Sequence, residues 1–96
     1  MPDAGETILK DPDATLDYGM DWSDWLAAAE VIDESAWSVQ ADSGLVASAP
    51  SHDDSATLVW LAGGSAGNIP WRVTNRITTD LGRTEDRSFF VRVTER

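Results

Sequence analysis

Hydrophobic and polar residues alternate along the last third of the chain, over residues 71–79 and again over residues 88–94. The apolar positions are Trp71, Val73, Ile77, Phe89, Val91 and Val93. Because side chains on a strand point alternately to opposite faces, this pattern predicts two long antiparallel strands joined by a turn near Gly82. Such a pair needs a second layer over its apolar face, so the pattern predicts a small β-sandwich.

Shorter apolar segments predict the other strands. Residues 16–22 alternate in the same way, with their apolar positions at Leu16, Tyr18, Met20 and Trp22. The run Thr57–Leu61 is more continuously apolar, which favours a strand that is buried on both faces or central in its sheet. Weaker strands are predicted at residues 31–32, 37–39 and 45–49, and polar turns or loops at 42–44, 50–55 and 63–68.

These segments predict one all-β domain, an immunoglobulin-like or fibronectin-like β-sandwich of about seven strands. We assign residues 11–96 to the sandwich and residues 1–10 to an N-terminal arm, which is either loose or a short edge strand. The turn signal Asp11-Pro12-Asp13 separates the two. Residues 27–30 are expected to form a loop, because so few residues do not make a stable helix.

The chain has five tryptophans, which is a high count for one small core. The parity of Trp22 with Tyr18 and Met20 places its side chain in that core. One or two of the others are expected at the surface, where tryptophan often anchors a protein interface. Trp25 or Trp37, if presented on an exposed loop, would supply a ring that stacks on a sugar or a protein.

Charge is divided unevenly along the chain. Residues 1–48 hold eleven acidic residues and one base, Lys10, whereas residues 49–96 hold six acids and six arginines. The formal net charge of -10 therefore lies in the first half. This surface disfavours nucleic acids and anionic membranes, which select lysine and arginine. It suits either solubility or a basic partner, and an acidic face with an Arg-bearing face would allow head-to-tail contact between copies.

Residues that carry enzyme chemistry are absent or unfavourably placed. The chain has no cysteine, which excludes disulfides and thiolate metal sites. His52 lies in a polar loop, Ser23 lies in no G-x-S-x-G elbow, and a chain of this size has little room for a substrate cleft. We therefore expect no catalytic site, no metal and no cofactor. The clustered acids fit solvated turns better than calcium sites; they are Asp11, Asp13, Asp17, Asp53 and Asp54.

No apolar run is long enough for a transmembrane helix, and the N-terminus lacks the apolar core of a signal peptide. We therefore expect the protein to be made in the cytoplasm and to have no membrane partner.

Several segments, taken together, resemble small virion proteins of tailed bacteriophages that are encoded among the head, connector and tail genes. These segments are Asp21-Trp22-Ser23-Asp24-Trp25-Leu26, Val59-Trp60-Leu61-Ala62-Gly63-Gly64, Val73-Thr74-Asn75-Arg76-Ile77-Thr78-Thr79 and Gly82-Arg83-Thr84-Glu85-Asp86-Arg87-Ser88. Proteins of this kind are often described as fiber-tail adaptors. The resemblance covers roughly residues 11–96. None of the segments is a catalytic or metal motif, and no functional residue is carried over.

The resemblance implies a non-enzymatic structural protein of a virion with an immunoglobulin-like fold. Its role would be to join tail or neck components through protein–protein contacts, as a homo-oligomeric ring or in multiple copies, with other tail, neck or capsid proteins as partners. Decoration of the capsid surface is the alternative. A second alternative is a soluble carbohydrate- or protein-binding sandwich.

Three regions are predicted to contact partners. The predicted contact residues are Ile8 and Leu9 in the arm, Trp25 in the loop after residue 22, and Arg83, Glu85, Asp86 and Arg87 in the last turn. For the turn, the alternative is that Arg83 and Arg87 pair only with the acids between them, and surface pairs of that kind contribute little to stability.

Overall fold

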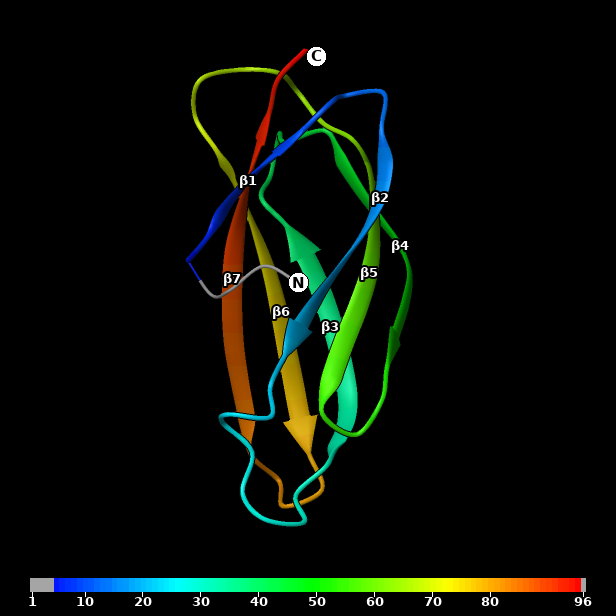
Figure 1. Ribbon diagram of the computed structural model, residues 1–96, viewed down its shortest axis with the longest axis vertical. Coiled ribbons are helices and arrows are strands. Elements are labelled where there is room, and N and C mark those ends of the chain that lie inside the picture. Colours follow the sequence, from blue (N-terminus) through cyan, green and yellow to red (C-terminus); the bar gives the residue numbers. More distant parts are fainter. Residues whose placement is uncertain (1–4, 96) are drawn as a thin grey trace.

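The computed structural model describes residues 5–95 of the chain (Figure 1). Within that range it contains seven strands and no helix. The strands are β1 (Thr7–Lys10), β2 (Thr15–Asp21), β3 (Ile32–Val39), β4 (Leu45–His52), β5 (Ala56–Gly63), β6 (Trp71–Thr79) and β7 (Thr84–Val93). A four-stranded sheet in the order β1-β7-β6-β3 packs against a three-stranded sheet in the order β2-β5-β4. The all-β sandwich predicted from the alternating pattern is confirmed.

The strands with the clearest alternation form the centre of the four-stranded sheet. β6 and β7 pair antiparallel, and β3 pairs antiparallel with the other side of β6. β1 pairs parallel with β7, in a register that runs from Thr7 opposite Phe90 to Lys10 opposite Val93. Residues 7–10 of the predicted arm are therefore an edge strand, while residues 1–4 lie outside the described part of the chain.

The apolar run Thr57–Leu61 lies in β5, the central strand of the three-stranded sheet, as the sequence predicted. Its side chains alternate: Thr57, Val59 and Leu61 are buried, whereas Leu58 is partly exposed and Trp60 is exposed. β2 and β4 pair antiparallel with the two edges of β5. The alternative prediction, a strand buried on both faces, is therefore wrong.

β7 begins at Thr84, so Glu85, Asp86 and Arg87 of the predicted turn lie in a strand. β3 and β4 also run further than predicted. Residues 31–32 and 37–39 were expected to be separate, but residues 32–39 form the single strand β3, with a bulge between Ile32 and Glu34. β4 continues to His52 through residues predicted as a loop, with a bulge between Ser48 and Ser51 around Pro50. Main-chain pairing to β6 and β5 continues both strands through polar residues, which a hydrophobic pattern does not signal. Trp37 consequently lies in a strand and not on a loop.

The core fills the space between the two sheets. Its buried apolar residues are Met20, Trp22, Ile32, Leu45, Val59, Leu61, Val73, Ile77, Phe89, Val91 and Val93. Trp22 is the largest fully buried side chain, which confirms its predicted place. Phe89 contacts two partly buried aromatic rings, those of Tyr18 and Trp37, at centroid distances of 5.8 and 6.1 Å. Full burial of an apolar side chain of this size contributes roughly 1.5–3 kcal/mol, so these residues dominate the stability of the fold.

Asn75, a buried polar residue of β6, connects the two sheets. Its side-chain oxygen accepts hydrogen bonds from Trp22 Nε1 at 2.9 Å and Thr57 Oγ1 at 2.7 Å. Its amide nitrogen donates to Ser35 Oγ at 2.9 Å and to the Ala36 carbonyl at 3.2 Å. All four hydrogen-bonding positions of the amide are therefore used. Antibody domains carry a disulfide between their sheets, whereas this sandwich is linked there by hydrogen bonds.

A second connection between the sheets lies at the end of the sandwich away from the β6–β7 turn. The buried Lys10 ammonium donates hydrogen bonds to the Gly63 carbonyl at 2.6 Å and the Asp11 carbonyl at 2.9 Å. Its burial lowers the pKa of Lys10. The next residue of the connection to β6, Gly64, has a φ of 113°, and a Cβ there would lie 2.6 Å from a methyl group of Val93. Only glycine permits this close approach.

Candidate interaction surfaces

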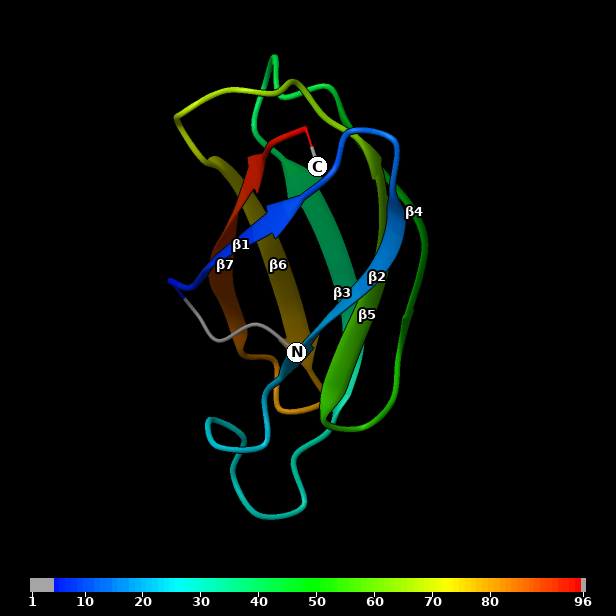
Figure 2. The ribbon, with the colours of Figure 1, turned by 45° about the horizontal axis from the view of Figure 1, so that its top comes forward.

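Loop 22–31, between β2 and β3, and the β6–β7 turn at residues 80–83 meet at one end of the molecule (Figures 1 and 2). The loop contains no helix, as expected. Val31 N donates to Asp80 Oδ1 at 3.0 Å, and Asp80 N donates to the Val31 carbonyl at 3.1 Å, so the two segments are hydrogen-bonded. We call the charged and aromatic residues at this end the end cluster; they are Trp22, Asp24, Trp25, Glu30, Arg83 and Arg87.

A buried carboxylate is at the centre of the end cluster. Glu30 accepts hydrogen bonds from Arg83 Nε at 2.8 Å, Thr79 Oγ1 at 2.6 Å and Ala27 N at 2.8 Å, and it also forms an ion pair with Arg83 Nη2. The bond from Arg83 is the main reason that the pKa of Glu30 falls from 4.5 to about 2. The Arg83 guanidinium lies 4.0 Å from the centroid of the Trp25 ring. Loop and turn are therefore joined by charge, hydrogen bonds and a cation–π contact.

Arg87 of β7 forms a second link to loop 22–31. Its guanidinium lies 4.5 Å from the Trp22 ring centroid, and its Nη1 donates to Asp24 Oδ1 at 3.0 Å and to the Asp21 carbonyl at 3.2 Å. The Trp22 ring meets Trp25 edge to face at 5.7 Å. Both arginines thus cover an aromatic ring and neutralise an acid of loop 22–31.

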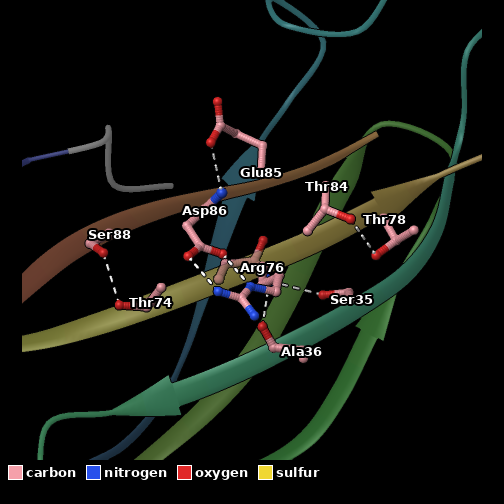
Figure 3. A network of polar contacts seen from close by, with 10 residues as sticks. Ser35, Ala36, Thr74, Arg76, Thr78, Thr84, Glu85, Asp86 and Ser88 are labelled. Atoms are coloured by element: carbon pink, nitrogen blue, oxygen red, sulfur yellow. Dashed lines mark hydrogen bonds and ion pairs between the residues drawn. The ribbon is translucent and has the colours of Figure 1, made fainter. Parts of the chain in front are cut away.

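The remaining predicted residues of the hairpin lie on the outer face of the four-stranded sheet or at its end (Figure 3). Asp86 accepts two hydrogen bonds from Arg76, at 2.7 and 3.0 Å, and its backbone N donates to Glu85 Oε1 at 3.1 Å. Arg83 and Arg87 therefore take their ion-pair partners from loop 22–31, and Asp86 pairs across the strands. The alternative prediction, in which the turn charges pair only among themselves, is wrong.

The predicted arm residues lie on β1, away from the end cluster. Ile8 is partly buried and packs against the core, whereas the Leu9 side chain is 52% exposed. Leu9 is in register with Arg92, close to the far end of β7. The structure thus brings Trp25, Arg83 and Arg87 together and separates them from Ile8 and Leu9. Their role as interface residues stays a prediction.

Trp60, which was not among the predicted interface residues, lies on the outer face of the three-stranded sheet. Its side chain is 38% exposed, and it stands between Asp17 of β2 and Ser48 of β4 in the pairing register. We call this surface the Trp60 face; it consists of Asp17, Gly19, Val46, Ser48, Leu58, Trp60 and Ala62. Strand alternation within residues 57–61 points the Trp60 side chain outward. Because nearly every residue of this run is apolar, however, the sequence suggested burial on both faces.

A contrasting surface lies on the outer face of the four-stranded sheet. Arg72 is paired directly with Phe90, with its guanidinium 5.8 Å from the ring centroid, and Leu9 is paired with Arg92. We call this surface the Arg72 face; it consists of Thr7, Leu9, Arg72, Phe90 and Arg92. Ion pairs among the described residues involve Arg76, Arg83 and Arg87, which leaves Arg72 and Arg92 outside them.

Two shallow hollows of about 310 and 290 Å³ lie beside the Arg72 face. Both are lined by Ser38 and Thr74, and Arg72 lines the first and Arg76 the second. Within residues 5–95, no group of three or more His, Cys, Asp or Glu side chains is placed to hold a metal ion. No helix in the same range is long and apolar enough to cross a membrane.

Residues 10–92 match the family described as podophage GP4 fiber-tail adaptor protein gp77. The chain belongs to this family. The match spans β2 to β6 completely and nearly all of β7, so the matched range of this chain includes the end cluster and most of both sheet faces. It confirms the resemblance to small structural proteins of phage virions. No curated protein matches the sequence.

Proposed function

We propose that this protein is a non-enzymatic structural adaptor of a podophage virion, made in the host cytoplasm, that joins tail or neck components through protein–protein contacts. The family match over residues 10–92 is the observation that carries the proposal. The strand orders β1-β7-β6-β3 and β2-β5-β4 also support an immunoglobulin-type connectivity, in which loops at the ends of a rigid sandwich are available for binding.

An adaptor needs at least two separate contact regions, and this molecule offers them. One is the end cluster, where ion pairs and cation–π contacts hold loop 22–31 in one shape before any partner binds. Such preorganisation reduces the entropy lost on binding. The loop exposes residues 27–29. We assign Trp25, Arg83, Glu85, Asp86 and Arg87 to this contact region.

The second contact region is β1. The Ile8 side chain packs against the core, and the Leu9 side chain is exposed on the outer face of the sheet. We assign this region to another component or another copy of the chain, because virion parts are usually arranged in symmetric assemblies. An adaptor that used only one of the two regions would decorate a surface and would not join two components.

The proposal is tested by adding the purified protein to phage particles that lack it and measuring its incorporation by light scattering and quantitative gel analysis. A tail or neck adaptor should saturate at about six to twelve copies per particle, as closed rings require. Hundreds of copies would instead indicate capsid decoration. A chain that does not join the particles would exclude a role in the virion and favour a soluble binding module.

The end-cluster contact is tested with Ala28→Arg, because Ala28 is exposed on loop 22–31 and its side chain carries no polar group. We expect this variant to fold and to lose incorporation into the particles. Ala66→Arg, at an exposed position in the connection before β6, is the matched control and should incorporate normally. Equal incorporation of both variants would rule out loop 22–31 as a contact.

A further inference from the structure

The Trp60 face presents an aromatic residue beside an acid. On β5, Leu58, Trp60 and Ala62 form an apolar stripe along the centre of the three-stranded sheet. Asp17 is directly opposite Trp60 in the register, and Gly19, a buried residue, is opposite Leu58. Among the described residues, Asp17 forms no ion pair. Tryptophan at the centre of such a surface is typical of residues that dominate binding energy.

The Arg72 face presents the opposite charge around a similar apolar centre. Phe90 and Leu9 supply apolar surface, and Arg72 and Arg92 lie beside them without an ion-pair partner among the described residues. Arg92 makes one long bond, from its Nε to the Gly67 carbonyl at 3.5 Å. In a chain with a net charge of -10, such unpaired arginines are a local exception to an acidic surface.

We propose that the Trp60 face of one copy docks on the Arg72 face of the next, so that the protein associates head to tail. Acid meets arginine and apolar centre meets apolar centre in this contact, whereas two Trp60 faces or two Arg72 faces would place like charges together. The proposal deepens the proposed function, on which it rests, by naming a second copy as the partner at β1.

The size of the molecule is consistent with this contact. The whole molecule measures 43 × 22 × 20 Å, so a contact on one broad side can cover at most on the order of 900 Å² per copy, which leaves room for the roughly 800 Å² that each partner contributes to a standard interface. The two docking faces belong to different sheets, so both are accessible in one copy. A contact between unlike faces builds a ring if its rotation closes and an open stack if it does not.

Sedimentation velocity of the purified full chain over a range of concentrations tests the proposal without any phage component. We expect the mass of the wild-type protein to rise with concentration beyond that of a dimer. Trp60→Ser removes one face and Arg72→Glu removes the other, so each variant alone should remain a monomer. An equimolar mixture should form a one-to-one dimer that does not grow, because only one functional pair of faces remains.

Leu81→Ser is the matched control, since Leu81 is an exposed apolar residue on the β6–β7 turn and should leave assembly unchanged. Asp17→Arg serves as a second variant of the Trp60 face if Trp60→Ser does not fold. The proposal fails if the wild type is monomeric throughout, if either variant still self-associates, or if the mixture does not dimerise. Any of these results leaves the proposed adaptor role intact, because incorporation into particles is measured separately.

Discussion

The end cluster and the Trp60 face both combine tryptophan with charged residues, but they use them differently. In the end cluster, Arg83 pairs with Glu30 and covers Trp25, and Arg87 pairs with Asp24 and covers Trp22. On the Trp60 face, Asp17 is outside the ion pairs of the described residues and the tryptophan ring is exposed.

This difference separates residues that shape a loop from residues that remain available for a partner. The arginines of the end cluster already form charge-assisted hydrogen bonds within the chain, so a partner gains little by pairing with them. Their effect on binding is to hold loop 22–31 in place. The Trp60 face can still gain free energy by losing contact with water.

Replacing the buried tryptophan of the end cluster should have the largest effect. Trp22→Ala removes a fully buried ring and leaves the side-chain oxygen of Asn75 without one of its two hydrogen-bond donors. We therefore expect the free energy of unfolding to fall by roughly 3–5 kcal/mol. Urea denaturation monitored by circular dichroism measures it. If Trp22→Ala folds with normal stability but loses assembly, its role is that of a contact residue.

Removing Arg83 should have an intermediate effect. Arg83→Ala leaves the buried Glu30 carboxylate without its ion-pair partner, and it uncovers the Trp25 ring. We expect a loss of stability smaller than that of Trp22→Ala but clearly measurable by urea denaturation. Arg76→Ala is the matched control, because its partner Asp86 is exposed and remains solvated. Equal effects of the two substitutions would contradict the structural role of Arg83.

Acid should weaken the end cluster through Glu30. Its pKa is 4.5 ordinarily and about 2 in the folded protein. Above pH 4.5 both states are ionised and the contribution to stability is complete, whereas between pH 4.5 and 2 the unfolded chain takes up a proton first and stability falls. Wild type should therefore lose more stability than Glu30→Gln over this range. Parallel pH profiles of the two would refute this assignment.

Removing the exposed tryptophan should have the smallest effect on folding. Trp60→Ala changes a residue on the outer face of β5, so we expect a loss of about 1 kcal/mol or less. Urea denaturation beside Trp22→Ala gives the comparison directly, because both variants remove an indole ring. A loss similar to that of Trp22→Ala would show that Trp60 belongs to the core, and the contrast between the two regions would disappear.

The sequence predicted the sandwich and most of its core because alternation is a local property of a strand. It identified β6, β7 and β2, and it placed Trp22 correctly, since neighbouring residues of known parity surround it. It shortened β3 and β4, because residues 34–36 and 51–52, which carry little hydrophobic pattern, are held by main-chain pairing to neighbouring strands. Such pairing depends on residues far along the chain.

The candidate sites were harder to predict for the same reason. Trp25 and the two arginines, Arg83 and Arg87, were predicted in two separate contact regions, and the fold brings them together. Their partners were missed, because Glu30 and Arg83 are 53 residues apart and Asp24 and Arg87 are 63 apart. Trp60 was missed because a run of apolar residues suggested burial on both sides.

The parallel pairing of β1 with β7 also determines how the molecule would respond to force. The two strands lie side by side and are joined by backbone hydrogen bonds. Phe90 N donates to the Glu6 carbonyl at 2.8 Å, and Thr94 N donates to the Lys10 carbonyl at 2.9 Å. Tension that pulled β1 and β7 along their length in opposite directions would act in shear on the whole pair at once. Each hydrogen bond contributes only roughly 0.5–1.5 kcal/mol, but in shear the bonds of the pair carry the load together. A short edge strand loaded in this way can act as a mechanical clamp between the parts that it connects.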